Sequence, residues 1–249
     1  MGYTSRINKY LALCGIASRR AAEILVTEGR VSVNGEIISD LGRQIDHDLD
    51  TVTVNGEPVA PTKERIYLLM NKPPLTITSS HDPQGRRTVI DVLADARKEF
   101  SLRVFAVGRL DYDTEGALLL TNDGMLAHRL THPKYQIEKV YQALVDGKFT
   151  KEHSEKIRAG IELEDGAIGH AEAQLLNRAG SNSYVKLILT EGRKREVKQL
   201  LSACGLNTLQ LTRLTFAGIS AKGLKSGGVR ELTSAELTSL RKQVSGSSD

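Results

Sequence analysis

The stretch GRLDYDTEGALLLTND, Gly108 to Asp123, places three carboxylates within five residues, at Asp111, Asp113 and Glu115, before an apolar run typical of a strand. Three kinds of site would use such a cluster. A calcium loop would use all three carboxylates, a phosphate-transferring site would use the first two, and a turn between strands would need only one. The fold and the chemistry of the chain depend on which of these the sequence supports.

The calcium interpretation fails at one position and in its flanks. Asp111, Asp113, Glu115 and Gly116 occupy the first, third, fifth and sixth positions of an EF-hand loop, but Asn122 stands where the bidentate Glu is needed. An EF-hand also needs helices on both sides, and both flanks here are strand-like. The sequence therefore does not favour a calcium loop.

The phosphate-transfer interpretation requires Asp-x-Asp-x-Thr, and here Glu115 occupies the fifth position while Thr114 comes one residue early. A magnesium-binding pair depends on a fixed turn, so this shift in register counts against it. We interpret the stretch as a turn between two strands that positions one carboxylate, with Gly116 permitting tight geometry. A turn with no catalytic role is the alternative.

The composition is that of an ordinary soluble globular protein, since 40% of the 249 residues are hydrophobic and 26% are charged. No apolar run approaches the roughly 18 residues that span a bilayer, and the first ten residues lack the apolar core of a signal peptide. We expect a cytoplasmic protein without a membrane segment. Cys14 and Cys204 lack metal-ligand spacing, so no metal site is expected.

Positive charge is concentrated in two blocks, although the net charge of the chain is only +4. Residues 190–230 contain eight Lys or Arg against two Glu, and the first thirty residues contain five against two. Such blocks on a nearly balanced chain predict a polyanionic partner. Solvated helix faces are the alternative.

The first sixty residues have the pattern of a small separate module. One amphipathic helix follows Ser5 as its cap, and a second runs from its cap at Ser18 to Gly29. Hairpin turns are then predicted at Asn34-Gly35 and Asn55-Gly56, each between alternating strands. Two helices followed by a small sheet give an α/β module.

A proline-containing linker predicts a domain boundary, with an N-terminal module of residues 1–62 and a larger domain of residues 63–245. Strands outnumber helices in the larger domain, so we expect an α+β fold with a mostly antiparallel mixed sheet flanked by helices. Its final helix begins with a capping box at Thr233 and Glu236, and the tail at residues 243–249 is predicted to be disordered. The expected strands are residues 66–73, 104–110, 117–123, 139–147 and 183–192, and the expected helices are 125–132, 151–160 and 195–205.

The N-terminal module resembles the RNA-binding domain of the ribosomal protein S4 family. The resemblance rests on a helix, the motif Gly-x-x-Ser-Arg-Arg at residues 15–20, a second helix, and Gly-Arg-Val-x-Val-Asn-Gly at residues 29–35. It implies that basic side chains of the two helices contact RNA, where a helix N-terminus also favours phosphate. The implied contact residues are Arg6, Lys9, Arg19, Arg20 and Arg30.

Four ordered motifs of the larger domain resemble bacterial ribosomal-RNA pseudouridine synthases of the RsuA/RluB type. They are Gly-Arg-Leu-Asp-x-x-Thr-x-Gly at residues 108–116, the preceding segment at 71–93, Lys-x-Tyr at 139–141, and the basic motif at 189–205. With the S4-like module, the resemblance spans nearly the whole chain. It implies the pseudouridine synthase fold and a cofactor-free enzyme that converts one uridine of ribosomal RNA to pseudouridine.

The resemblance is strongest to enzymes that modify the 23S RNA of the large subunit. A 16S RNA enzyme of the small subunit and a non-catalytic RNA-binding assembly factor are the alternatives. The implied partner is ribosomal RNA or an assembly intermediate of the ribosome, and we expect the chain to act as a monomer.

The resemblance also implies roles for individual residues. Asp111 is the catalytic nucleophile, and an ionised carboxylate in a dry pocket needs a cation nearby. Lys198 matches the position of that cation, with Arg195 as second choice. Tyr141 stacks under the uracil and acts as general base, and Lys139 on the same strand face would lower the pKa of its phenol.

Further residues complete the implied site. Arg109, Arg193 and Arg195 are expected to bind RNA, and Asp113 and Glu115 are expected to face away from the negatively charged RNA. Leu200 either closes the pocket or belongs to the helix core.

Overall fold

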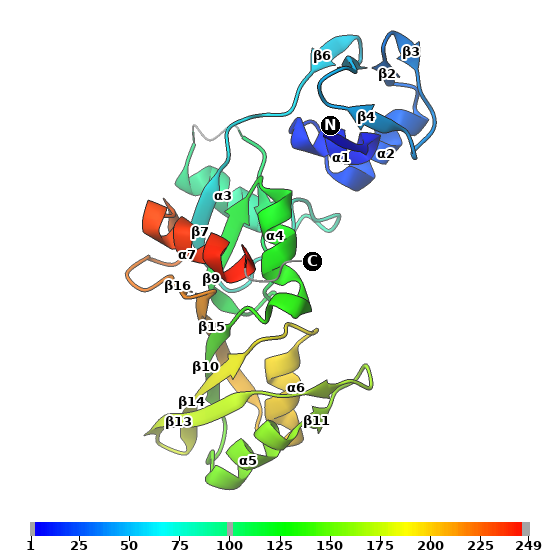
Figure 1. The fold of residues 1–249 in the computed structure, drawn as a ribbon. Coiled ribbons are helices and arrows are strands. Elements are labelled where there is room, and N and C mark those ends of the chain that lie inside the picture. Colours follow the sequence, from blue (N-terminus) through cyan, green and yellow to red (C-terminus); the bar gives the residue numbers. More distant parts are fainter. Residues whose placement is uncertain (1–2, 99–101, 246–249) are drawn as a thin grey trace. The chain divides into compact units, whose positions relative to one another are not determined.

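The computed structural model describes residues 3–98 and 102–245, which divide into two compact units at Arg65 and Ile66. The boundary predicted from the linker in the sequence lies three residues earlier, after residue 62. Figure 1 gives the order of the elements along the chain. Within the described ranges, no helix has the length and apolar character that crossing a bilayer requires.

The N-terminal unit packs two helices against short antiparallel strands around a core that includes Ile7, Leu11 and Val26. Ser18 caps the second helix by accepting a hydrogen bond from the backbone N–H of Ala21 at 3.1 Å. Both predicted hairpin turns are present. The elements are β1 (Thr4–Arg6), α1 (Ile7–Leu13), α2 (Arg19–Thr27), β2 (Val31–Val33), β3 (Glu36–Ile37), β4 (Gln44–Asp46), β5 (Val52–Val54) and β6 (Glu57–Val59).

The prediction that Ser5 caps the first helix is wrong. Ser5 lies in β1, and Arg6 precedes α1 without a capping bond from its side chain. The Ser5 hydroxyl is instead hydrogen-bonded to Nε2 of His47 at 2.8 Å. The β1 to β4 pairing, which the sequence pattern does not indicate, therefore determines where this helix begins.

The larger unit is built on one sheet in the order β13-β14-β10-β15-β9-β7-β17. Among the described strands of this sheet, only β15 and β9 pair in parallel, which confirms the predicted mostly antiparallel mixed sheet. Two further short strands attach to it, β8 to β9 and β16 to β15. The strands are β7 (Tyr67–Lys72), β8 (Phe105–Ala106), β9 (Glu115–Thr121), β10 (Lys139–Val145), β13 (Glu172–Ala179), β14 (Asn182–Leu189), β15 (Thr208–Phe216), β16 (Ile219–Ser220) and β17 (Val229–Glu231), with β11 (Ile161–Glu162) and β12 (Ile168–Gly169) as a separate pair.

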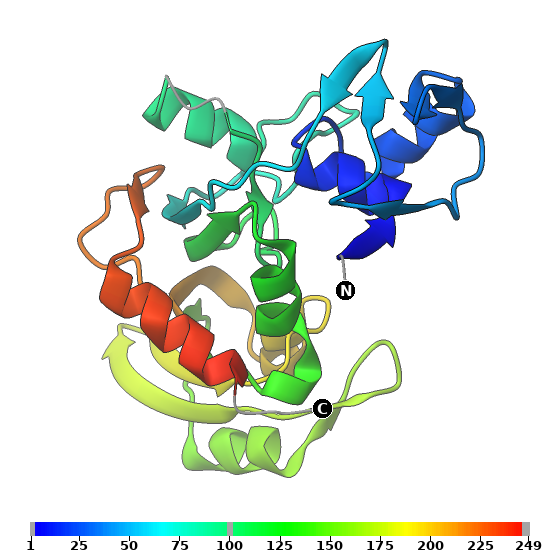
Figure 2. The same ribbon diagram turned by 45° about the horizontal axis from the view of Figure 1, so that its top comes forward.

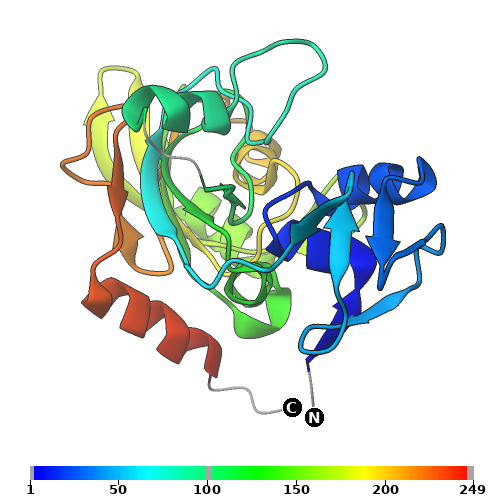
Figure 3. The same ribbon diagram turned by 90° about the horizontal axis from the view of Figure 1, so that it is seen from above.

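Helices cover both faces of the half of the sheet that contains β7. Figure 3 shows α3 on one face of β7 and α7 on the other, and Figure 2 shows α7 running beside α4. Apolar clusters fill both layers: Val92 of α3 packs with Leu118, while Leu240 of α7 packs with Leu130. The helices are α3 (Val89–Ala96), α4 (Gly124–Thr131), α5 (Lys151–Ala159), α6 (Glu196–Ala203) and α7 (Ser234–Ser245), with the 3-10 turn η1 (Pro133–Tyr135).

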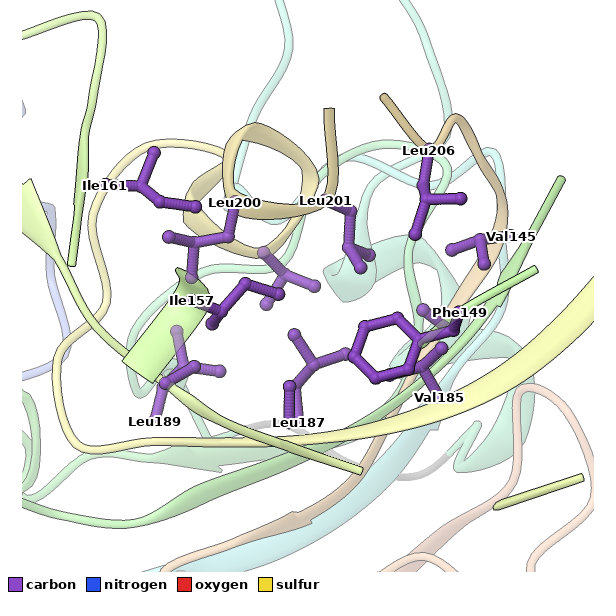
Figure 4. Close-up of a cluster of buried hydrophobic side chains, with 14 of the residues drawn as sticks. Val145, Phe149, Ile157, Ile161, Val185, Leu187, Leu189, Leu200, Leu201 and Leu206 are labelled. Atoms are coloured by element: carbon purple, nitrogen blue, oxygen red, sulfur yellow. The ribbon is translucent and has the colours of Figure 1, made fainter. Parts of the chain in front are cut away.

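The other half of the sheet is covered by α5 and α6. Figure 4 shows Ile157 of α5 and Leu200 of α6 packed over Leu187 and Leu189 of β14. Leu200 is fully buried in this apolar cluster, so it belongs to the helix core. This packing fixes the start of α6, and with it the basic segment that precedes the helix.

The C-terminal capping box is confirmed, because Thr233 and Glu236 exchange backbone-to-side-chain hydrogen bonds of 2.8 and 3.2 Å. The prediction of a disordered tail from residue 243 is wrong for residues 243–245, which belong to α7. Val244 packs in the apolar core, which extends the helix. The remainder of that tail, residues 246–249, lies outside the described residues.

Candidate active site

A cavity of about 130 Å³ opens between strands β10, β14 and β15 and two loops. We call residues 107–114 the carboxylate loop and residues 190–195 the basic loop. The walls include Asp111 and Arg109 of the first loop, Arg193 and Arg195 of the second, and Tyr141 of β10. The structure therefore brings together carboxylate, phenol and guanidinium groups that lie far apart in the sequence.

The carboxylate loop is held in a tight turn directly before β9. The backbone N–H of Thr114 donates to the carbonyl of Asp111 at 3.1 Å. Gly116 has φ +110°, and a Cβ there would lie 2.2 Å from the carbonyl oxygen of Arg213. Only glycine fits at this approach of β9 to β15, so Gly116 fixes the distance between the loop and the strand.

Thr78, from the segment before the motif, fastens the same loop. Its hydroxyl donates to the carbonyl of Leu110 at 2.7 Å and accepts from the N–H of Leu110 at 3.2 Å. One side chain thereby satisfies both backbone groups of Leu110, the residue before Asp111. A catalytic carboxylate benefits from such fixed placement, because small displacements cost large factors in rate.

Lys72, at the end of β7, is completely buried beneath the carboxylate loop. Its Nζ donates to the carbonyl oxygens of Thr114 at 2.7 Å, Pro73 at 3.0 Å and Tyr112 at 3.3 Å. Burial lowers the pKa of the Lys72 ammonium to about 8, although the charges of Asp113 and Asp111 act in the opposite direction. No signal in the sequence singles out this residue beyond its place in the segment 71–93.

Tyr141 and Arg213 are direct partners across β10 and β15, so their side chains lie on the same face of the sheet. Arg213 is only 2% exposed and also lines the cavity. Its Nε donates to the carbonyl of Ala117 at 2.8 Å, and its guanidinium lies 4.9 Å from the ring centre of Phe216. Sequence reasoning missed Arg213 because it missed the whole strand β15.

Lys139 holds the basic loop. Its Nζ donates to the carbonyls of Thr190 at 2.9 Å and Ile137 at 2.7 Å. Burial, and secondarily the charge of Arg213, lower the pKa of Lys139 to about 8. Lys139 and Tyr141 both line the cavity, and an effect of the lysine on the phenol stays a prediction.

The expected pairing of Lys198 with Asp111 is not what the structure has. Lys198 Nζ lies 2.6 and 2.7 Å from the two carboxylate oxygens of Asp113. The expectation that Asp113 faces away from RNA stays a prediction, but Asp113, and not Asp111, is the partner of Lys198. The physical reason is that Asp111 is recessed in the cavity wall, whereas the more exposed carboxylate of Asp113 reaches α6.

The ion pair also decides the protonation of Asp113. Burial alone would raise the pKa of its carboxyl group, but the Lys198 ammonium and the charge of Arg195 outweigh this and lower it. Glu115 has partners as well, since it accepts from Gln210 at 2.6 Å and from Thr212 at 2.9 Å. Both carboxylates that the sequence suggested were incidental thus join β9 and its turn to neighbouring elements.

The start of α6 shapes the basic loop. Arg195 precedes the helix with φ +52°, a left-handed conformation uncommon for a residue with a side chain. Glu196 follows it, and its carboxylate accepts from the N–H of Arg193 at 2.9 Å. Burial raises the pKa of Glu196, and its Oε1 has no partner among the described residues. Arg193 also pairs with Glu191 at 3.0 Å.

The five basic residues expected to contact RNA in the N-terminal unit are all exposed. Two have contacts within the unit: Arg30 donates to Asn55 at 2.9 Å and to Glu28 at 3.1 Å, and Lys9 lies over the Tyr3 ring. Arg19 and Arg20 begin α2, where free backbone N–H groups favour an anion. Taken across the residues that the structure describes, no three His, Cys, Asp or Glu side chains gather in a way that could hold a metal ion.

Comparison with known proteins identifies the family. Residues 66–203 match the RNA pseudouridylate synthase family, and residues 5–49 match the S4 domain. An RNA pseudouridine synthase of Aquifex aeolicus (strain VF5) is 43% identical over 240 residues, which cover 96% of this chain and 94% of the relative.

Two further relatives extend the comparison. The ribosomal large subunit pseudouridine synthase B of Bacillus subtilis (strain 168) is 41% identical over 238 residues, covering 95% of each chain. The crystal structure of a pseudouridylate synthase superposes with a TM-score of 0.66 at 28% identity and covers 94% of this chain and 99% of that one. The chain therefore belongs to the RNA pseudouridylate synthase family: it is an isomerase that acts on uridine in RNA, with an S4 domain ahead of its catalytic domain.

Proposed function

We propose that this protein isomerises a specific uridine of 23S ribosomal RNA, as a cytoplasmic monomer that needs no cofactor. The observation that carries the proposal is the cavity in which Asp111 and Tyr141 lie together, with Arg109, Arg193 and Arg195 of the two loops in its walls. The choice of the large subunit is supported by the Bacillus subtilis relative, which is named for it and matches over 95% of each chain.

Asp111 is the proposed nucleophile. A carboxylate oxygen attacks C1′ of the ribose while the bond from C1′ to N1 of uracil breaks. The freed ring turns within the cavity, C5 bonds to C1′, and the carboxylate is released. The short turn fixed by Thr78 and Lys72 holds the carboxylate in one place through these steps.

Tyr141 is the proposed platform for the uracil ring and the base that removes the proton from C5. It lies on β10 in the cavity wall, where the pairing of β10 with β15 fixes its backbone. Lys198 is the proposed source of positive charge near the nucleophile. In the structure Lys198 is paired with Asp113, so this role requires the ammonium to move from one carboxylate to the other.

The proposed RNA contacts fall into two sets. Arg109, Arg193 and Arg195 are exposed where they line the cavity, and they would bind phosphates beside the extruded nucleotide. Arg6, Lys9, Arg19, Arg20 and Arg30 of the S4 domain would bind phosphates elsewhere on a structured RNA, which makes affinity depend on salt.

The test is pseudouridine mapping on 23S and 16S RNA from cells that lack the gene, repeated after complementation. We expect one 23S position to lose pseudouridine and to recover it with the wild-type gene. Asp111→Asn should not restore it, because an amide cannot act as the nucleophile. Asp95→Asn is the matched control, since Asp95 of α3 pairs with Arg87, does not line the cavity, and should restore pseudouridine.

Each rival function has its own result in this experiment. A lost position in 16S RNA would assign the enzyme to the small subunit. Unchanged maps combined with tight binding of the protein to ribosomal RNA would favour a non-catalytic assembly factor. Full activity of Asp111→Asn would contradict the assignment of the nucleophile but not the reaction.

A further inference from the structure

Arg213 is a buried charge with an unused hydrogen-bond donor. The residue is 2% exposed, and its Nη2 has no hydrogen-bond partner among the described residues. A buried donor without a partner destabilises the folded state, and more so when the group is charged. A position that retains such a group at the wall of a cavity suggests that a ligand supplies the missing acceptor.

The rest of the guanidinium is fixed. Nε donates to the carbonyl of Ala117 on β9, and the plane lies close to the Phe216 ring. Arginine stays protonated in proteins, so the charge persists at every pH at which the enzyme works. The ion pairs found among the described residues do not include Arg213, although its charge helps to lower the pKa of Lys139 and of Lys72.

The location of Arg213 selects the kind of ligand. It is opposite Tyr141 in the β10 to β15 pairing and lines the same cavity as Asp111. Phosphates remain near solvent, where the exposed Arg109, Arg193 and Arg195 are available. A group as deeply buried as Arg213 would meet the part of the nucleotide that enters the cavity, which is the base.

We propose that Arg213 is a catalytic residue whose Nη2 donates a hydrogen bond to a carbonyl oxygen of the uracil ring and stabilises the ring while it is detached. This inference rests on the proposed reaction. When the bond between N1 and C1′ breaks, its electron pair stays with the ring, and the negative charge spreads over N1, O2 and O4. A fixed cation at one of these oxygens lowers the energy of that state more than it lowers the energy of neutral uridine.

The remaining steps balance without any other reagent. C1′ is held by the Asp111 carboxylate while the ring turns, and the charge remains paired with Arg213. C5 then forms its bond to C1′ as the carboxylate leaves, the C5 proton passes to the base, and a proton is returned to N1, which completes the isomerisation. Arg213 neither gains nor loses a proton, and holding the anion also prevents free uracil from escaping.

The test compares Arg213→Gln with the wild type on two RNAs that contain either uridine or 5-fluorouridine at the target position. Fluorine withdraws electrons and stabilises the detached ring anion by itself, so the reaction should depend less on Arg213. Single-turnover consumption of the N1-linked nucleoside is measured by digestion and mass spectrometry. This readout is needed because the fluorinated ring has no C5 proton to lose.

We expect Arg213→Gln to react about 10²–10³-fold more slowly on uridine RNA, the usual effect of removing one oxyanion donor. On 5-fluorouridine RNA the loss should be smaller by about tenfold or more. RNA affinity should be unchanged, since the phosphate-binding arginines are intact. Equal losses on the two substrates, or no loss at all, would overturn the proposal.

Two controls keep the test decisive. Arg213→Lys retains the positive charge but lacks the planar guanidinium with its several N–H donors. Its single-turnover rate on uridine RNA should lie between the rates of the wild type and of Arg213→Gln. If both variants fail to fold, a crystal structure of the wild type with the 5-fluorouridine RNA decides, because Nη2 must then lie within hydrogen-bond distance of O2 or O4. A wild type that consumes neither nucleoside would count against the proposed function instead.

Discussion

The carboxylate loop and the basic loop, which face each other across the cavity, are anchored in the same way. Each is bound through its backbone carbonyls to a buried lysine at the end of a strand, Lys72 for the first and Lys139 for the second. Burial lowers the pKa of both ammonium groups to about 8. Two loops that carry opposite charges in their side chains thus share one kind of backbone support.

The two lysines differ in what lies around them. Lys72 is fully buried, has three carbonyl acceptors, and feels the charges of Asp113 and Asp111. Lys139 is 8% exposed, has two acceptors, and lines the cavity near Arg213. The comparison indicates that Lys72 only holds the carboxylate loop in place, whereas Lys139 holds the basic loop and also adds positive charge to the cavity.

Replacing Lys72 should have the largest effect on stability. Lys72→Met leaves three carbonyl oxygens without their donor, and we expect the free energy of unfolding to fall by about 3 kcal/mol. Urea unfolding followed by circular dichroism measures this. Lys151→Met is the matched control, because Lys151 has an 86% exposed side chain and should change stability by less than about 0.5 kcal/mol. A loss below about 1 kcal/mol for Lys72→Met would contradict the anchoring role.

Replacing Lys139 should cost less, about 2 kcal/mol, because only two carbonyls lose a donor. Hydrogen exchange then separates the two anchors. Lys139→Met should speed exchange in the basic loop and leave the carboxylate loop protected, and Lys72→Met should do the reverse. Faster exchange in both loops for either variant would mean that the loops are not anchored independently.

The two pKa values predict how stability changes with pH. Each lysine has a pKa near 8 in the folded protein and 10.5 when unfolded, so the unfolded chain binds more protons between these values. Each lysine therefore increases the free energy of unfolding as pH rises from 8 to 10.5, by up to about 1.4 kcal/mol per pH unit. Below pH 8 both states are protonated and the contribution is flat.

The measurement is the difference between wild type and each Lys→Met variant, taken in urea from pH 7 to 10, since other groups titrate equally in both proteins. The wild-type advantage should grow above pH 8. If this difference in the free energy of unfolding instead shrinks with rising pH, the carbonyl partners stabilise the ammonium form more than solvent does. The pKa of the lysine in the folded protein would then lie above 10.5.

Sequence reasoning succeeded where local patterns decide the structure. The two Asn-Gly hairpins have the positive φ values that this turn requires, and Thr233 caps the last helix as its spacing predicts. The mostly antiparallel sheet followed from the excess of strands over helices in the larger domain. Asp111 and Tyr141 were selected by motif, and they line one cavity.

The central strand β15 was missed because its alternation is interrupted. Leu211 and Arg213 are both buried, so a charged residue occupies a position where an alternating strand has an apolar one. The next buried residue is Phe216, three positions on instead of two, so the alternation of buried and exposed residues is broken there. A buried guanidinium is tolerated there only because the cavity and the Ala117 carbonyl adjoin it. The position that disrupts the pattern is thus the one we propose to be functional.

Long-range partners were the other failure. Lys198 and its partner are 85 residues apart, and the sequence offered three carboxylates within five positions as candidates. Which one faces α6 depends on the turn, and on the depth at which Lys72 and Thr78 hold Asp111. Spacing along the chain predicts neither the conformation of this turn nor the depth of Asp111 in the cavity wall.

The smallest expected effect concerns the ion pair that joins the two sides of the cavity. Asp113 has a 61% exposed side chain, so Asp113→Asn should change the free energy of unfolding by less than about 1 kcal/mol. It should also free Lys198 to approach Asp111, and pseudouridine formation should therefore largely survive or rise slightly. Single-turnover rates on the same RNA measure this. A rate as low as that of Asp111→Asn would mean that Asp113, and not Asp111, is the carboxylate on which the chemistry depends.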